Sequence, residues 1–366
     1  MANIKFIMVG GFLGAGKTTA IGRLARNYTE QGLKVGLVTN DQANGLVDTQ
    51  SLRAQGFLVG EVPGACFCCK FDDLVSTVKA LETEHHPDVV ITEPVGSCTD
   101  LVATVIEPLR KFHQGDFEVA PLAVLLKPEH GLKILGDEQS GFSPQAAYIF
   151  LKQIEEADVV AINKIDKLTP EQQEMLRDQV TRRYPNKEIV LVSGTHGDGF
   201  DTLVELFKKP RPSSGPMMEV DYEKYAEGEA ELGWLNATYE VSAQHDDILM
   251  NDVIVTLLQK IRASLLEGGA EPAHLKVLCQ TGEQFGVANL VGSDVDVELS
   301  VASDAKISTA ELFVNARAAV APEQLESAVQ DSIAALGQEK GLNFTQQKLQ
   351  RFSPAPPVPT HRFASS

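Results

Sequence analysis

The chain opens with the stretch Gly10-Gly11-Phe12-Leu13-Gly14-Ala15-Gly16-Lys17-Thr18-Thr19, which follows directly after an apolar run from Ile4 to Val9. A strand, a glycine-rich turn and a helix in this order are typical of a loop that binds phosphate groups. The glycines let the backbone curl so that successive N–H groups point at one anion, and the helix that begins near Thr18 adds its positive N-terminal end. The predicted phosphate-binding residues are Gly11, Gly14, Ala15, Gly16, Lys17, Thr18 and Thr19.

A second motif indicates which base is bound. The apolar run from Asp158 to Ile162 predicts a short strand, and it ends in Asn163-Lys164-Ile165-Asp166. A carboxylate at Asp166 accepts hydrogen bonds from two donors of guanine that adenine lacks, while the Lys164 stem lies on the purine face. Sites built on such bonds reject the wrong partner by about 10⁴ or more. Ser193, after the next apolar strand, is expected to close over the base, so the sequence predicts GTP and not ATP.

Two carboxylates are candidates for the phosphate end of the site. The run from Asp88 to Glu93 reads as a buried parallel strand that ends in an acid, and Gly96 follows it. Glu93 is expected to hold Mg²⁺ together with Thr18, and Gly96 to let the backbone approach the γ-phosphate. The strand from Lys34 to Thr39 leads to Asp41, a second Mg²⁺ candidate whose alternative role is an ordinary turn or cap. The predicted catalytic residues are Lys17, Asp41 and Glu93.

The run Cys66-Phe67-Cys68-Cys69 offers three thiols within four positions. Three thiolates fill three corners of a tetrahedral Zn²⁺ site and leave the fourth open, which suits a metal that must leave again. A helix that begins near Asp72 places the thiols before its N-terminus, where their pKa is lowered. Buried inert cysteines and a structural metal are the alternatives, and thiolates also suit other soft or borderline ions. Cys98 follows the acid strand by five residues and could approach the same loop, but it and Cys279 are expected to be core residues.

Together these motifs resemble the branch of phosphate-loop GTPases that includes the CobW-like proteins, the urease and hydrogenase nickel chaperones, and the mutase chaperone MeaB. The resemblance covers residues 1 to about 208, and Cys66-Phe67-Cys68-Cys69 is the mark of the CobW-like members. It implies that a transition metal binds in the cysteine loop. The chain departs from the CobW-like pattern at Asn40-Asp41-Gln42, which is closer to the urease nickel chaperone, and at the residues between Glu93 and Gly96.

The leading hypothesis is a GTP-hydrolysing metal chaperone that uses GTP and Mg²⁺ and passes a Zn²⁺-like ion to a client metalloprotein. The alternative is a MeaB-like chaperone that gates cofactor loading or reactivation of a client enzyme, with structural cysteines. A small-molecule kinase is a third reading, which the Asn163 to Asp166 motif argues against. A homodimer is compatible with either of the first two.

Composition and net charge indicate which partners and which cell compartment to expect. The 366 residues carry a net charge of −18, from 50 acidic and 32 basic side chains. Such a surface repels phosphate backbones, so a nucleic-acid partner is not expected. Met1 lies three residues from the first core strand and no apolar run approaches 18 residues, which predicts a cytoplasmic protein without a membrane span.

The order of the elements predicts a fold in several parts. Alternating strands and helices predict an α/β phosphate-loop GTPase domain at residues 1–208, with a mainly parallel sheet flanked by helices. A linker rich in Pro and acids is expected at 209–232, where the acid run reads as solvated surface. Residues 233–345 predict a smaller α+β domain of about four strands backed by two helices. A Pro-rich extended tail, 346–366, contains His361 and is expected to dock a client, fold back on the GTPase domain, or serve as a semi-rigid end.

Overall fold

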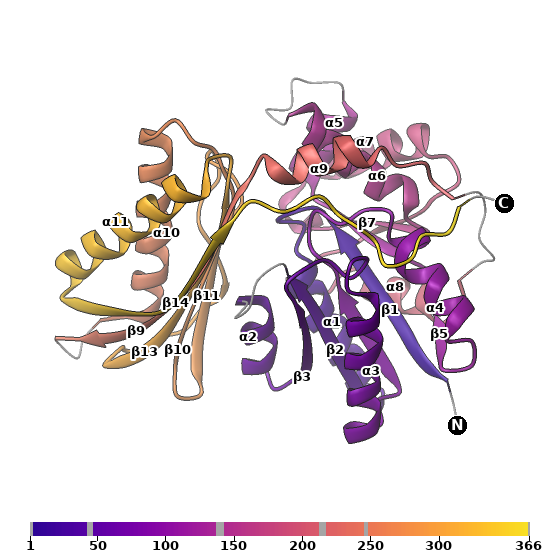
Figure 1. Cartoon of the computed structure of the whole chain (residues 1–366), viewed down its shortest axis with the longest axis horizontal. Helices are drawn as coiled ribbons and strands as arrows, with labels where there is room; N and C mark the ends of the chain where they lie inside the picture. The colour runs from indigo at the N-terminus through magenta and orange to yellow at the C-terminus, as the bar shows by residue number, and fades with distance from the viewer. Residues whose placement is uncertain (1–2, 42–46, 137–142, 212–216, 245–247, 365–366) are drawn as a thin grey trace. The chain divides into compact units, whose positions relative to one another are not determined.

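The computed structural model describes residues 3–41, 47–136, 143–211, 217–244 and 248–364, and for Asp41 the backbone alone. It divides the chain into two compact units (Figure 1). The first contains the described parts of Met1–Gln42, Phe57–Gly228 and Pro356–Ser366. The second contains those of Ala43–Gly56 and Glu229–Ala355. Each unit has its own sheet.

The first unit is built on a parallel sheet. Its strands follow the order β3-β2-β4-β1-β6-β7-β8, with β5 also paired to β1. Every pairing is parallel, and β4 is buried throughout. Strands of such a sheet are covered on both faces, which explains their continuous apolar runs. The bounds are β1 (Ile4–Gly11), β2 (Val35–Asp41), β3 (Leu58–Pro63), β4 (Val89–Glu93), β5 (Phe117–Val119), β6 (Ala123–Leu126), β7 (Val159–Ile162) and β8 (Glu188–Leu191).

Helices connect these strands and bring all their carboxyl ends to one edge of the sheet, where α/β proteins bind ligands. Figure 1 shows them packed around the sheet. The predicted α/β fold of this part is confirmed. The bounds are α1 (Lys17–Glu30), α3 (Phe71–His85), a π-helix (Val102–Ile106), α4 (Glu107–Phe112), α5 (Pro128–Leu135), α6 (Pro144–Glu156), a 3₁₀ turn (Ile165–Lys167), α7 (Pro170–Arg183), α8 (Phe200–Phe207) and α9 (Tyr222–Ala230).

The second unit is a six-stranded antiparallel sheet in the order β12-β11-β10-β13-β9-β14. Two long helices, α10 and α11, cover it and share one apolar core with it. The helix α2 (Val47–Ala54) belongs to this unit, where Val47 packs with Leu278, Val287 and Phe313 in a separate apolar cluster. The bounds are β9 (Gly233–Ala243), α10 (Met250–Glu267), β10 (Pro272–Thr281), β11 (Gln284–Leu290), β12 (Glu298–Val301), β13 (Thr309–Ala318), α11 (Pro322–Lys340) and β14 (Leu342–Phe352).

Two strands of this sheet, β13 and β14, were not among the predicted four. In β13, polar residues such as the buried Arg317 interrupt the apolar pattern expected of a central strand. The Arg317 guanidinium lies over the Trp234 ring, 4.0 Å from its centroid. The strand β14 has a mostly exposed, polar sequence, as befits an edge strand. Residues 346–352 are therefore strand, and the extended tail begins only after Phe352.

The described part of the segment expected to be a linker contains the helix α9. The helix α9 contains Tyr225, which is fully buried, and its hydroxyl accepts a hydrogen bond from the Thr99 backbone N–H at 3.3 Å. Tyr222 donates to Asp100 at 2.8 Å. Most acidic side chains of this run are exposed, as expected of a solvated surface, and Glu229 is the buried exception. Two tyrosines at helical spacing anchor the helix to the first unit.

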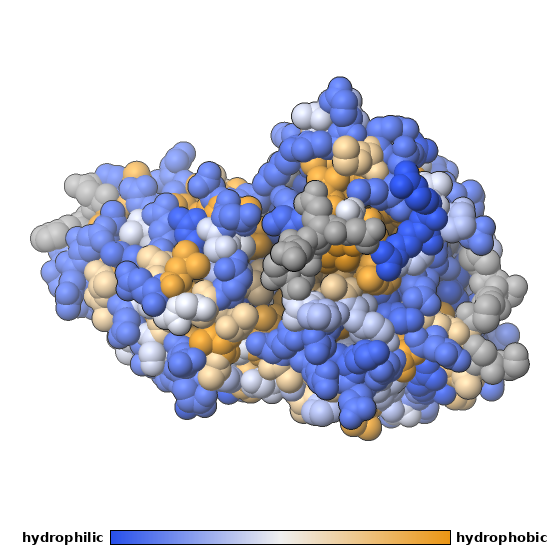
Figure 2. All heavy atoms as spheres, turned by 90° about the horizontal axis from the view of Figure 1, so that it is seen from above, coloured by the Kyte–Doolittle hydropathy of each residue, from blue (hydrophilic) through white to orange (hydrophobic). Residues whose placement is uncertain are grey.

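Among the described residues, every helix is too short or too polar to cross a membrane. Hydrophilic residues cover much of the face seen in Figure 2, as expected from the excess of acidic side chains.

A buried carboxyl at the end of α6 makes the stability of the first unit depend on pH. Glu156 accepts hydrogen bonds from the Thr99 hydroxyl and the Val102 N–H, both at 3.2 Å. Burial raises the pKa of Glu156 from 4.5 to about 8. The folded state therefore binds more protons than the unfolded state between these two values, so the free energy of unfolding falls as the pH rises through this interval.

We expect Glu156→Gln to reduce the slope of the free energy of unfolding against pH by the contribution of about one proton, because a neutral amide does not titrate. Hydrogen exchange of peptides from β1 and β4 between pH 5 and pH 8, corrected for the intrinsic exchange rate, measures the stability of the first unit. Fluorescence of the single tryptophan, Trp234, reports the other unit. Identical pH slopes in the variant and the unchanged protein would contradict the assignment.

Candidate nucleotide and metal site

The phosphate loop has the curled backbone that its glycines predict. Gly11, Gly14 and Gly16 all have positive φ, at 138°, 74° and 87°. A Cβ on Gly16 would lie 2.6 Å from the Asn163 side-chain nitrogen, so only glycine fits there. The Lys17 ammonium folds back and donates to the Gly11 carbonyl at 2.8 Å. The loop thus presents a buried cation and the start of α1 to the same space.

The end of β4 meets this loop. The Thr18 hydroxyl donates to Glu93 at 3.1 Å. A Cβ on Gly96 would lie 2.8 Å from the Leu13 side chain and 3.1 Å from the Lys17 ammonium. A hydroxyl and a carboxylate oxygen are ligands that Mg²⁺ accepts, so the donor set fits the predicted magnesium site. The side chain of Asp41 lies outside the described residues, although the β2–β4 register brings its backbone to this edge.

The base-reading motif lies next to the phosphate loop. The Asn163 amide donates to the Ala15 carbonyl at 2.8 Å and accepts from the Gly194 N–H at 2.9 Å. Lys164 has φ 59°. The Ser193 hydroxyl donates to Asp166 at 2.5 Å. Asn163 therefore ties the two predicted halves of the nucleotide site together.

The sequence did not point to Arg23, which supports this arrangement from α1. Its guanidinium donates to the Gly194 and Thr195 carbonyls at 2.7 and 2.5 Å. An arginine on the polar side of an amphipathic helix carries no signal that distinguishes it from a solvated one.

The three thiols of the cysteine loop gather at one point. The Sγ atoms of Cys66, Cys68 and Cys69 lie within 4.8 Å of one another. The Cys66 sulfur is 2.8 Å from that of Cys68 and 3.2 Å from that of Cys69. The Cys69 and Lys70 N–H groups both donate to the Cys66 carbonyl at 3.0 Å, and this turn leads into α3. Cys66 and Cys68 are buried, and Cys69 is partly exposed.

Asn40, near the end of β2, holds the cysteine loop in place. Its buried amide donates to the Val62 and Ala65 carbonyls at 2.8 and 2.7 Å and accepts from the Phe67 N–H at 2.8 Å. Sequence reasoning singled out its neighbour Asp41 and missed this role. An Asn after a buried strand was the signal available, but the strand ends far from the cysteines in sequence.

The three thiols differ in the direction in which their surroundings shift the pKa. Hydrogen bonds from Cys68 first, and then from Cys69 and Cys98, lower the pKa of Cys66. The hydrogen bond to Cys66 raises the pKa of Cys68, and it raises that of Cys69 to about 11. One thiolate stabilised by neighbouring thiols is the state from which a metal displaces the remaining protons.

Cys98 is buried, as expected, and its thiol contributes to the lowered pKa of Cys66, so it lies near the cysteine cluster. Its N–H donates to the Val95 carbonyl at 2.9 Å. The buried Gln153 amide donates to the carbonyls of Gly96 and Cys98 at 3.0 and 2.9 Å. One short loop therefore contacts both the phosphate loop and the cysteine cluster. Cys279, in contrast, lies in the apolar core of the second unit.

Comparison with known proteins identifies the first unit. Residues 5–191 match the family model "CobW/HypB/UreG, nucleotide-binding domain". The chain belongs to the CobW/HypB/UreG family. The resemblance predicted from the motifs is confirmed. The shared domain contains all the motifs described above, from the phosphate loop to Asn163-Lys164-Ile165-Asp166.

Curated relatives in the family carry metal-related names. The chain is 30% identical over 207 residues to the zinc chaperone YeiR of Escherichia coli strain K12, covering 54% of this chain and 57% of that protein. It is 30% identical over 209 residues to the zinc chaperone CobW of a Sinorhizobium species, covering 51% and 58%. The chain thus spans less than two thirds of the length of these two relatives.

Solved structures of the same branch are more distant. The Zn(II)-bound YjiA GTPase of E. coli is 14% identical with a TM-score of 0.40, and the match covers 92% of this chain and 99% of that one. HypB of Helicobacter pylori in complex with nickel is 19% identical with a TM-score of 0.42, covering 58% and 92%.

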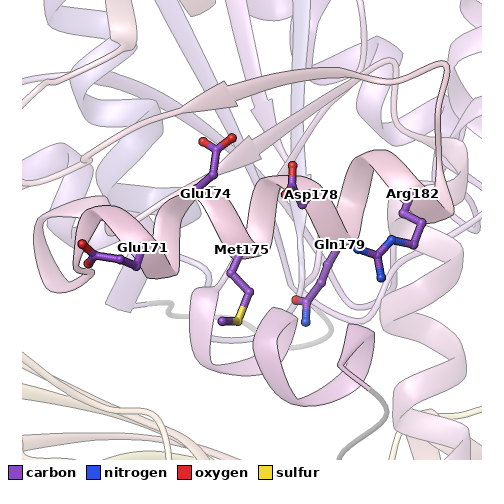
Figure 3. Close-up of a pocket in the computed structure, with 6 residues that line it drawn as sticks. All are labelled: Glu171, Glu174, Met175, Asp178, Gln179 and Arg182. Carbon is purple, nitrogen blue, oxygen red and sulfur yellow. The ribbon is translucent and has the colours of Figure 1, made fainter.

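A surface hollow of about 560 Å³ lies elsewhere in the family domain (Figure 3). All its lining residues come from the single helix α7, so it lacks the converging polar groups of a ligand site. They are Glu171, Glu174, Met175, Asp178, Gln179 and Arg182.

We expect Asn40→Ala to loosen the cysteine loop. The change removes the amide that hydrogen-bonds to buried backbone groups. Each group left unsatisfied lowers the stability of the loop by about 1–3 kcal/mol. Alkylation rates of Cys66 and Cys68, measured by peptide mapping of the metal-free protein, should rise. Asn27→Ala, on the exposed side of α1, is the matched control. Unchanged thiol reactivity in Asn40→Ala would show that the amide does not hold the loop.

Proposed function

We propose that this protein is a GTP-hydrolysing metallochaperone, which binds a Zn²⁺-like transition metal at Cys66, Cys68 and Cys69 and delivers it to a client protein. The observation that carries the proposal is the loop from Glu93 to Cys98, which contacts the phosphate loop at one end and the thiols at the other. The names of the two zinc-chaperone relatives support the choice of metal.

In this proposal the nucleotide residues have separate tasks. Lys17 and the backbone of the phosphate loop bind the phosphates, and Asp166 with Ser193 reads guanine. Thr18 and Glu93 hold Mg²⁺, which neutralises charge on the phosphates when it is bound. Gly96 gives the γ-phosphate access to the backbone, because a side chain there would meet Leu13 and Lys17.

The metal residues suit a cargo that is released. Three thiolates hold a soft or borderline ion and leave one coordination position for a further ligand. We propose Cys98 as that further ligand in the state that retains metal. Its position two residues after Gly96 means that a displacement caused by the γ-phosphate changes the number of thiolates on the ion.

Coupling of this kind requires that the two nucleotide states contact the metal site differently. The Glu93–Cys98 loop is the element through which they differ in our proposal, since the buried Gln153 amide makes its carbonyls move together. The client is then a metalloprotein or a cofactor-dependent enzyme that receives the ion after hydrolysis.

The burial of Cys66 and Cys68 keeps one alternative in view, a MeaB-like chaperone whose cysteines are structural. In that case GTP hydrolysis drives loading or reactivation of the client enzyme and no metal is exchanged. The metal affinity of the two nucleotide states separates the two functions.

The base specificity can be tested with Asp166→Asn. Asn presents a donor where xanthine carries a carbonyl, so the variant should prefer xanthine nucleotides while the unchanged protein prefers GTP over ATP by a large factor. Competition against a fluorescent GDP analogue measures all three affinities, with the exposed Asp178→Asn on α7 as control. Equal affinity of the unchanged protein for ATP and GTP would refute the assignment.

The central test is the metal affinity in two nucleotide states. A coupling of about 1–3 kcal/mol corresponds to a roughly 5-fold to 150-fold change in affinity between GDP and a non-hydrolysable GTP analogue. Titration of Zn²⁺ against a chromophoric chelator measures it. We expect about one ion per chain, lost in the Cys66, Cys68 and Cys69 triple serine variant.

Cys98→Ser should reduce the coupling and leave the stoichiometry unchanged, whereas Cys279→Ala in the other unit should change neither the coupling nor the stoichiometry. Equal affinities in both nucleotide states, with metal still bound to the triple serine variant, would favour the MeaB-like alternative.

A further inference from the structure

The C-terminal segment does not leave the protein as a free tail. After β14 ends, the chain continues without helix or strand and belongs, from Pro356, to the first unit. Residues 357–363, which we call the strap, pass over the cysteine loop. In Figure 1 this yellow segment ends beside α4. Of the three outcomes considered for the tail, the structure has it folded back on the GTPase domain.

The strap bonds directly to two of the metal-site cysteines. The Val358 N–H donates to the Cys69 sulfur at 3.3 Å. The Thr360 N–H donates to the Cys68 carbonyl at 2.8 Å, and its hydroxyl donates to the Cys69 carbonyl at 3.1 Å. The Val358 side chain itself is 76% exposed, so its backbone and not its side chain makes the contact.

Strong contacts anchor the strap beyond the cysteines. The Arg362 guanidinium donates to the buried Asp100 carboxylate at 2.7 Å, which supplies the charge partner that a buried carboxylate needs. The Phe363 N–H donates to the Ala103 carbonyl at 3.0 Å. The His361 ring packs against Phe71 and Phe112, with centroids 5.2 and 5.0 Å apart.

The thiol that the strap meets is the most accessible of the three. Cys66 and Cys68 are buried, while Cys69 is partly exposed. A ligand exchanging for the metal from solvent therefore meets Cys69 first. An N–H donated to a thiolate stabilises its charge, as outer hydrogen bonds do at metal sites.

We propose that the strap is part of the metal site: the Val358 N–H donates to the Cys69 thiolate, and the strap covers the face through which the metal leaves. An acceptor must displace the strap before it can take the ion. This inference rests on the proposed function in that it takes the metal as cargo, but the contact with Cys69 is independent of any metal.

A proline at position 358 removes the N–H that the strap donates to the Cys69 sulfur. The site already lies in an extended run with Pro354, Pro356, Pro357 and Pro359, so the backbone conformation suits a proline. Val358→Ala keeps the N–H and changes only an exposed side chain, which makes it the matched control. Arg362→Ala is a second route, because it removes an anchor without touching the cysteine loop.

With the holoprotein, we expect Val358→Pro and Arg362→Ala to release Zn²⁺ to an excess of chromophoric chelator about tenfold faster than Val358→Ala, the effect of one hydrogen bond to a charged group. In the Co²⁺-loaded protein, Val358→Pro should also shift the sulfur-to-metal charge-transfer band. A merely structural role for the tail would leave this band unmoved.

In the metal-free protein, the same two variants should raise the alkylation rate of Cys69 above its rate in Val358→Ala, while the rate of the buried Cys279 stays unchanged. Equal Zn²⁺ release rates, charge-transfer bands and Cys69 alkylation rates in Val358→Pro, Arg362→Ala and Val358→Ala would overturn the proposed role of the strap. If the cysteine loop binds no metal while Cys69 alkylation still rises, the contact stands and the proposed function fails. The thermal unfolding midpoint of each variant shows whether the fold is intact.

Discussion

The close approach of Gly96 to Lys17 is the constraint on which the site depends. A side chain at Gly96 would press on Leu13 and on the Lys17 ammonium, so the backbone after β4 runs directly against the phosphate loop. The residues that follow Gly96 reach the other parts of the site one after another. Cys98 lies near the thiol cluster, and Asp100 accepts a hydrogen bond from Arg362 of the strap. The single connection from β4 to the π-helix thus reaches the phosphate loop, the thiol cluster and the strap.

The helix α6 gives this connection its stiffness. Gln153 holds the carbonyls of Gly96 and Cys98, and Glu156 holds Thr99 and the N–H of Val102. Asp100 has φ 62°, a left-handed conformation that non-glycine residues adopt at a cost. In the proposed function this stiff segment moves as a unit when a γ-phosphate binds, because coupling between distant sites requires an element with two states.

Local patterns in the sequence predicted the parts of the site, and long-range contacts supplied what they missed. The phosphate loop, Asn163 to Asp166 and the cysteine loop are each written in a few consecutive residues, so their spacing was sufficient. Asn40, Cys98 and the strap act across many residues of chain, and no periodicity marks such pairings. The strands β13 and β14 were missed for another reason. Strand prediction relies on alternating apolar and polar residues, and this alternation is interrupted in β13 by the buried Arg317 and in β14 by a mostly polar sequence.

In the proposed function, the strap adds a backbone N–H to a thiol site from which the metal must leave. A closed four-thiolate site holds zinc as part of the fold. Here the outermost thiol, Cys69, has a hydrogen-bond donor on a segment whose anchors are an ion pair and ring contacts at the edge of the domain. In this proposal a partner replaces these contacts, which together limit access to the partly exposed Cys69 sulfur. The strap and the Glu93–Cys98 loop then set retention and release together, and the buried thiols Cys66 and Cys68 need not move.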